Sequence, residues 1–160
     1  VAHVQLANVL ATDIAGPFDA AICLGNSFGY FDDGDMERFI AKVARILRRG
    51  GKWLINSGML AESVLVGFTA QQSYSVGDLV MDITNVYDIQ SGAMLCYLDY
   101  TQGTRKERHA FKHYVYTFAD LKQRLARHGL HVTATYSDIE GAPFELGSQQ
   151  VYLVAEKKGD

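Results

Sequence analysis

Two apolar runs separated by an amphipathic helix pattern constrain the fold of this chain more than any other feature. The first run, FDAAICL (residues 18–24), is nearly continuous, which is typical of a strand covered on both faces. Apolar residues at helical spacing follow it, namely Met36, Phe39, Ile40, Val43, Ile46 and Leu47. Gly50-Gly51 ends that helix, and KWLIN (52–56) is a second buried strand. This order predicts a βαβ unit and a parallel sheet.

The middle of the chain is rich in β-forming residues instead. DLVMDITNVYDI (78–89) and AMLCYLDYT (93–101) are joined by Gln90-Ser91-Gly92, and the three segments together predict a hairpin. HAFKHYVYT (109–117) is a candidate third strand of the same sheet. We therefore expect an antiparallel β insert from about residue 67 to residue 116.

The last part of the chain returns to helix and strand. Thr117, with Asp120 three residues later, predicts the N-terminus of a helix that Gly129 ends. LHVTATY (130–136) alternates apolar and polar residues, as a strand near the edge of a sheet does, and a last strand closes the chain. Residues 1–160 are thus expected to form one α/β domain with an antiparallel insert.

The charge balance argues against several classes of partner. The chain has 15 basic and 18 acidic residues, a net charge of −3, so it has no general attraction for nucleic acid or for an anionic membrane surface. No apolar run approaches the roughly 20 residues of a membrane span. Cys23 and Cys96 both lie in apolar, strand-like segments, where a small buried thiol is more common than a disulfide. A reducing, cytoplasmic setting is the expectation that follows.

The turn after the first strand is the best candidate for a binding site. Ligands of parallel α/β sheets bind outside the carboxyl ends of the strands, where CLGNSFGYF (23–31) is expected to lie. Gly25 lets a ligand approach the backbone, and Asn26 and Ser27 offer polar groups. The aromatic residues Phe28, Tyr30 and Phe31 either form one wall of a pocket or pack into the core. No nucleophile motif is present, and His109 and His113 lack a nearby ligand at metal-binding spacing, so we expect no metal site.

Three stretches in order make the sequence resemble a known family. They are ANVLATDI (7–14) ahead of GPFDAAICLGNSF (16–28), then residues 78–101, then HYVYTFADL (113–121). Together they resemble class I S-adenosylmethionine-dependent methyltransferases, and within them the glycine N-methyltransferase type and its small-molecule bacterial relatives. The resemblance covers the chain from about Leu6 to its end. It implies a Rossmann-like methyltransferase sheet, S-adenosylmethionine as cofactor and methyl transfer to a small molecule.

The resemblance also implies positions for the cofactor. Asn8 falls where the family hydrogen-bonds the adenine, and Val9 replaces an aromatic residue that often packs on that ring. Leu24 and Gly25 would contact the methionine part of the cofactor, and Tyr30 would be a polar ring in contact with it.

On the acceptor side, the resemblance implies that Asn26 and Tyr114 are catalytic, with Asn26 facing the substrate. Tyr74 lies within one residue of a substrate-site tyrosine. Plain packing is the alternative for each tyrosine. Methyl transfer needs positioning and exclusion of water more than a covalent intermediate, which suits a site of Asn, Ser and Tyr.

Two parts of the family pattern are not found in the sequence. Neither the glycine-rich cofactor loop nor the ribose-binding acid occurs between Val1 and Val9, so we expect both to lie upstream. In the family's strand order, 3-2-1-4-5-7-6, the first strand here would then be a bare edge. The alternative to an enzyme is a non-catalytic methyltransferase-like domain or fragment that acts through protein association. The aromatic residues of the insert favour a homo-oligomer, namely Tyr87, Tyr97, Tyr100 and Phe111.

The acceptor is expected to differ from glycine. Glycine-type enzymes hold the substrate carboxylate with an arginine, and Gly58 stands at its place here. No Arg or Lys occurs from Trp53 to Gln102, so a small slip in alignment does not restore the clamp. Glu62 is the only charge nearby, and it would favour a cation or a hydroxyl as substrate, unless it only caps or ion-pairs locally. We therefore expect an amine or a hydroxylated molecule as acceptor.

Overall fold

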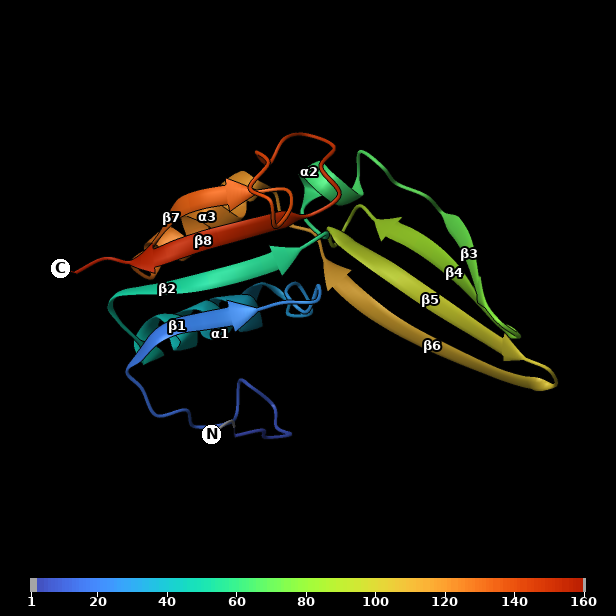
Figure 1. The fold of residues 1–160 in the computed structure, drawn as a ribbon, viewed down its shortest axis with the longest axis horizontal. Helices are drawn as coiled ribbons and strands as arrows, with labels where there is room; N and C mark the ends of the chain where they lie inside the picture. The colour runs from blue at the N-terminus through green and yellow to red at the C-terminus, as the bar shows by residue number, and fades with distance from the viewer. Residues whose placement is uncertain (1–2, 160) are drawn as a thin grey trace.

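The computed structural model describes residues 3–159, which form two four-stranded sheets joined end to end (Figure 1). The body contains β1 (Phe18–Cys23), β2 (Leu47–Ser57), β7 (Leu130–Tyr136) and β8 (Val151–Lys157) in the order β1-β2-β8-β7. The insert contains β3 (Gln71–Val76), β4 (Leu79–Asp88), β5 (Ala93–Gln102) and β6 (Arg105–Tyr114) in sequence order. The α/β class with an antiparallel insert is confirmed.

The predicted βαβ unit is present. β1 and β2 are parallel, and α1 (Asp33–Ile46) connects them. The Asp32 side chain accepts a hydrogen bond from Asp35 N, and so caps the helix at its N-terminus. The helix ends at Ile46 and β2 begins at once at Leu47, so the expectation that Gly50-Gly51 ends the helix is wrong. Both glycines lie inside β2, which is longer at its start than the predicted KWLIN segment.

The second half of the body follows the prediction as well. Thr117 caps α3 (Phe118–Arg127) by accepting a hydrogen bond from Asp120 N. β7 is an edge strand, whereas β8 lies between β7 and β2 and is antiparallel to both. The core lies between one face of this sheet and the two helices, and its fully buried members include Met36, Ile40, Trp53, Ile55, Leu121, Leu125 and Leu153.

The expectation that the first strand is covered on both faces is wrong. Ala21 and Cys23 pack against the core, but Ile22 between them is 69 % exposed. β2 is the only strand paired with β1 in the part of the chain that the structure describes. The bare edge that the family's strand order implies is therefore observed. Within residues 3–159, β1 therefore has one face and one edge open despite its continuous apolar run.

The insert sheet is confirmed, with one more strand than predicted. β4, β5 and β6 match the three predicted segments, and β3 pairs antiparallel with β4. The sequence of β3, QQSYSV, is mostly polar and exposed, so hydrophobic periodicity gave no signal for it.

Side chains alternate between the two faces of the insert sheet. The registers place Asn85, Met94 and His113 on one face, which we call the His113 face. Tyr114 and its partner Ala93 lie on the other, which we call the Tyr114 face. In Figure 1 the sheet extends away from the body, and no helix lies over its outer part.

The insert leaves and rejoins the body at one point, which we call the stem. α2 (Ala61–Val64) begins directly after the chain leaves β2. Leu60 and Tyr116 form a parallel bridge, and Ala61 N donates to Tyr116 O at 2.9 Å. The Glu62 carboxylate accepts from Phe118 N, with both oxygens at 3.0 Å. One main-chain hydrogen bond and the Glu62 side chain thus hold the two ends of the insert together.

Three further features bear on the sequence predictions. Both cysteines are free thiols, and burial raises the pKa of Cys23 and of Cys96. Residues 3–159 contain no helix long and apolar enough to cross a membrane. They also contain no group of three or more potential metal-binding side chains.

Candidate functional site

The turn at the carboxyl end of β1 has an open backbone. Gly25 and Asn26 both adopt left-handed conformations, with φ of 68° and 58°. A side chain at Gly25 would meet nothing within 4 Å, so this part of the backbone is accessible. Leu24, which precedes it, is 47 % exposed. An exposed apolar residue beside an open backbone at a strand end is an arrangement that can receive a ligand.

Asn26 ties this turn to the neighbouring strand. Its Oδ1 accepts hydrogen bonds from Gly58 N at 2.9 Å and from Ser57 Oγ at 3.2 Å. Since Ser57 and Gly58 lie at the carboxyl end of β2, one amide oxygen fixes the ends of both parallel strands relative to each other. Asn is one of the few residues other than Gly that adopt a left-handed conformation at modest cost.

The aromatic residues of the turn divide between the two alternatives. Phe28 is 2 % exposed and packs edge-on against Trp53, and Phe31 packs against Phe39 at the margin of the core. Tyr30 is 47 % exposed, so it alone among the three offers much of its surface at the site.

His113 lies against Tyr30 and was not recognised as a site residue from the sequence. The two ring centroids are 4.1 Å apart, and the Phe111 ring is 5.2 Å from that of His113. His113 is 2 % exposed, and neither ring nitrogen has a hydrogen-bond partner among residues 3–159. Burial lowers the pKa of His113, and the Asn26 backbone opposes this only in part. The imidazole is therefore neutral at pH 7.

The structure brings Asn26, Tyr30 and His113 together but places Tyr114 elsewhere. Tyr114 follows His113 on β6 and so points to the opposite face of the insert, where Lys112 Nζ lies 4.7 Å from its ring centroid. Its backbone N donates to Gly29 O at 2.7 Å, which joins the turn to the insert. The catalytic role of Tyr114 stays a prediction. The signal in the sequence that could have identified His113 is its spacing of four residues from His109, which on a strand places both side chains on one face.

The two residues predicted to contact substrate lie apart from the turn. Glu62, on α2, has its carboxylate engaged by Phe118 N at the start of α3, in line with the capping alternative. Tyr74, on β3, is 51 % exposed and donates its hydroxyl to Gln72 Oε1 at 2.9 Å. Their substrate roles stay predictions.

Asn8 and Val9 belong to the segment that precedes β1. Asn8 is exposed and its Oδ1 accepts from Leu10 N at 2.9 Å, while Val9 is half-buried. Lys42 Nζ, on α1, donates to the carbonyls of Leu10 and Thr12 and so fastens this segment to the body. Their roles toward the adenine also stay predictions.

A cavity of about 520 Å³ opens between the body and the His113 face of the insert. It lies at the carboxyl end of β2, beside α2 and the segment that enters β8. Its lining residues are Gly58, Met59, Ser63, Val64, Gly67, Phe68, Thr69, Gln72, Asn85, Met94, Gly147 and Gln149. We call it the Ser63 cavity.

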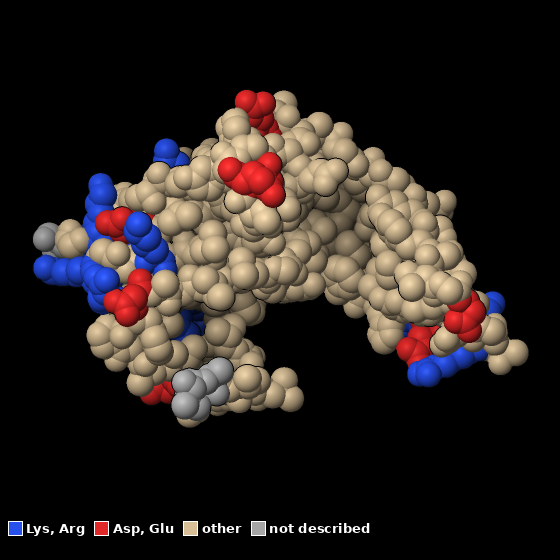
Figure 2. Space-filling model, in the orientation of Figure 1, with Lys and Arg blue, Asp and Glu red and all other residues tan. Residues whose placement is uncertain are grey.

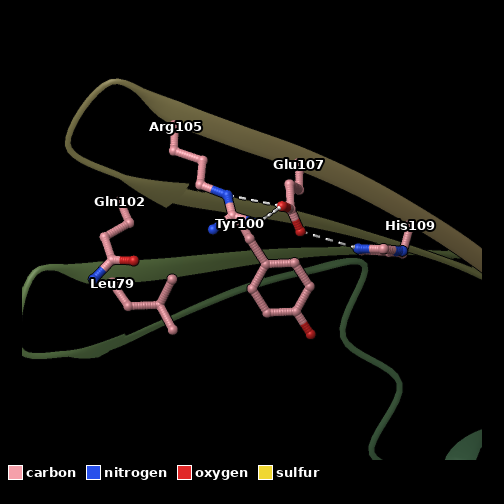
Figure 3. Close-up of a pocket in the computed structure, with 6 residues that line it drawn as sticks. All are labelled: Leu79, Tyr100, Gln102, Arg105, Glu107 and His109. Carbon is pink, nitrogen blue, oxygen red and sulfur yellow. Dashed lines mark hydrogen bonds and ion pairs between the residues drawn. The ribbon is translucent and has the colours of Figure 1, made fainter.

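A second hollow lies at the far end of the insert (Figure 3). It is lined by Leu79, Tyr100, Gln102, Arg105, Glu107 and His109. Arg105 Nε donates to Glu107 Oε1 at 2.8 Å, and His109 Nε2 lies 3.6 Å from Glu107 Oε2. These charged groups pair with one another on an open sheet face, far from the carboxyl end of β1, so the hollow is a poor candidate for the reaction site.

Comparison with known proteins agrees with this fold. No family model matches the chain. Glycine N-methyltransferase of the rabbit, Oryctolagus cuniculus, is 33 % identical over 94 residues, which cover 54 % of this chain and 32 % of that protein. The matched part is thus about a third of the curated relative.

Solved structures match nearly the whole chain. An S-adenosylmethionine-dependent methyltransferase from Clostridium acetobutylicum superposes with a TM-score of 0.83 at 14 % identity, over 97 % of this chain and 64 % of that one. The methyltransferase CcbJ from Streptomyces caelestis gives 0.84 at 12 % identity, over 96 % and 63 %. The sugar N-methyltransferase KedS8 from Streptoalloteichus gives 0.67 at 19 % identity, over 96 % and 61 %. The chain therefore has the Rossmann-like fold of the class I S-adenosylmethionine-dependent methyltransferases.

Proposed function

We propose that this chain takes part in S-adenosylmethionine-dependent methyl transfer to a small molecule, with an amine or a hydroxyl as acceptor. The turn after β1 is the observation that carries the proposal. In a methyltransferase fold it combines an open Gly25 backbone, an Asn26 side chain locked to β2 and a half-exposed Tyr30. The similarity to glycine N-methyltransferase and to small-molecule methyltransferases supports the same reaction class.

The residues of the turn fit the methionine part of the cofactor. Leu24 offers exposed apolar surface, and a Cβ at Gly25 would occupy open space that a ligand can fill instead. Tyr30 would lie along the ligand, and Asn8 and Val9 would serve the adenine. Bound S-adenosylmethionine would supply a methyl group on a positively charged sulfur. An acceptor nitrogen or oxygen that attacks the methyl carbon in line would break the carbon–sulfur bond and release S-adenosylhomocysteine and the acceptor's proton.

The chain's own residues would position the acceptor and exclude water. Asn26 holds the ends of β1 and β2 in a fixed relation, so that groups bound at the two ends keep their alignment. The His113 face of the insert contacts the turn at the carboxyl end of β1 through Tyr30, which would help to keep water from a ligand there. Neutral imidazole at this place adds no positive charge that would repel a sulfonium.

The environment of Gly58 supports an acceptor other than glycine. A Cβ at Gly58 would lie 3.0 Å from Gln149 O, so a longer residue would have to displace backbone. Lys and Arg gather at the far end of the body and at the tip of the insert, and the surface between them shows none in the view of Figure 2. A carboxylate clamp from this part of the chain is therefore not expected.

The proposal is tested by a nuclear magnetic resonance titration of the 160-residue chain with S-adenosylhomocysteine, which detects weak binding. We expect saturable shifts at Leu24, Gly25 and Tyr30, and no shifts at Gly77 and Gly103 in the insert turns, which are the internal control. The sequence lacks the glycine-rich loop and ribose acid, so we expect weak affinity. Micromolar affinity would contradict that expectation, and shifts confined to the insert turns would contradict the proposed site.

Association with a second copy is the second candidate function, and it is compatible with the first. The exposed edge and face of β1, with Ile22 69 % exposed, and the uncovered outer part of the insert favour it. We expect a dimer or larger homo-oligomer in sedimentation at tens of micromolar. A strict monomer at that concentration would exclude it.

A further inference from the structure

The Ser63 cavity has the size and the position of a small-molecule subsite. Its volume of about 520 Å³ lies within the usual range for ligand pockets. Gly58, in its wall, donates its N–H to Asn26 Oδ1. The wall of the cavity is therefore hydrogen-bonded directly to the turn where the proposed methyl donor binds. Met94, also in the wall, is the cross-strand partner of His113.

Ser63 gives this cavity an unused polar group. Its residue is 6 % exposed, and its Oγ has no hydrogen-bond partner within residues 3–159. A buried hydroxyl without a partner is unfavourable, and such groups in native proteins are normally satisfied by protein, water or ligand. A donor or acceptor on a molecule in the cavity would satisfy it after a rotation about one side-chain bond.

The lining selects against charge. The described residues around the cavity include no Asp, Glu, Lys, Arg or His. Their polar side chains are hydroxyls and amides, among them Gln72, Asn85 and Gln149, and the rest of the wall is apolar, with Met59, Phe68 and Met94. A charged group placed here would lose water without gaining a counter-ion, whereas a hydroxyl or an amide would find partners of its own kind.

From this geometry we propose that the Ser63 cavity binds an uncharged, hydroxyl- or amide-bearing part of the methyl acceptor, with the Ser63 hydroxyl as a specificity-determining partner. The proposal rests on the proposed function and adds to it the chemical class of the group that anchors the acceptor. The reacting amine or hydroxyl would then lie on the other side of Gly58, toward Asn26.

The test uses three small molecules of similar size in titrations of the 160-residue chain, monitored by its amide resonances. N-acetylethanolamine carries a hydroxyl and an amide without charge, N-acetylethylenediamine carries a cation and N-acetylglycine carries a carboxylate. We expect N-acetylethanolamine to shift the amide resonances of Ser63, Gly67 and Gln149 saturably. The two charged molecules should bind at least about tenfold more weakly. Equal binding of all three, or no saturable shift at the cavity, would overturn the proposal.

Variants at two serines sharpen the test. Ser63→Ala should weaken the binding of N-acetylethanolamine about fivefold, the usual effect of losing one hydrogen bond. It should leave the melting temperature unchanged or higher, because it removes an unpaired buried hydroxyl. Ser75→Ala, on the exposed part of β3, is the matched control and should change neither. Unchanged affinity in Ser63→Ala would contradict the role of the hydroxyl. If S-adenosylhomocysteine causes no shift at Gly25 in the unsubstituted chain while the cavity still binds N-acetylethanolamine, the result would count against the proposed function alone.

Discussion

The body and the insert are both four-stranded sheets, but they bury their side chains differently. In the body, α1 and α3 close one face of the sheet, and Trp53, Ile55 and Leu153 are at most 1 % exposed. In the insert, Tyr74 is 51 %, Val76 78 % and Val86 46 % exposed. The insert buries Ala93, Met94 and Cys96 but exposes large apolar side chains elsewhere. Because burial of apolar surface drives folding, we expect the body to contribute more of the folding free energy than the insert, which depends more on strand pairing.

Matched leucine substitutions should give the largest contrast between the two regions. Leu153→Ala, in the body, removes a fully buried side chain and should lower the free energy of unfolding by about 2–5 kcal/mol. Leu98→Ala, in the half-buried middle of β5, should cost about 1 kcal/mol. Urea denaturation measures both. Equal losses would show that the insert contributes a core of its own, for instance through an oligomer.

Asn26 joins the ends of two body strands, β1 and β2, and its replacement should have an intermediate effect. Asn26→Ala loses two hydrogen bonds to the end of β2 and puts alanine at a φ of 58°, so we expect a loss of about 1–3 kcal/mol. Asn26→Gly loses the same hydrogen bonds without the backbone cost, and should be about 1 kcal/mol more stable than the alanine variant. Identical stabilities in thermal unfolding would contradict the left-handed conformation.

His113 should give the smallest effect, visible as a dependence on pH. Its pKa is lower in the folded chain than in the unfolded chain, so the unfolded chain binds more protons as the pH falls below about 6.5. Stability should therefore decrease from pH 7.5 to pH 5.5, by at most about 1.4 kcal/mol per pH unit from this residue. His113→Gln should flatten the curve relative to His109→Gln, the exposed control on the same strand. Parallel curves for the two variants would contradict a buried neutral imidazole.

The elements that sequence predicts well here have local signals. Helical spacing and the Thr117–Asp120 cap located α3, and the Gln90-Ser91-Gly92 turn located the hairpin. β3 had no such signal, because its residues are polar and it is specified by pairing with β4. The open face of β1 was missed because an apolar run indicates a buried strand but does not show which other elements pack on its faces.

The candidate site was predicted only in part, because only some of its features have a local signal in the sequence. The turn at residues 23–31 was found because strand ends and glycines are visible in sequence. Which of His113 and Tyr114 faces that turn depends on the register of β6 with β5, and a shift of one residue exchanges them. The Ser63 cavity forms between segments distant in the chain, so no local pattern reports it.

The stem described above also makes the insert an exchangeable unit. Because the chain leaves at Leu60 and returns at Tyr116, already hydrogen-bonded to each other, the intervening sheet can change in length or sequence without altering the distance that the body must bridge. Substitutions can therefore accumulate in the insert on one side of this junction while the packing of the body on the other side stays intact. For protein engineering, residues 60 and 116 are natural graft points at which one insert can be substituted for another.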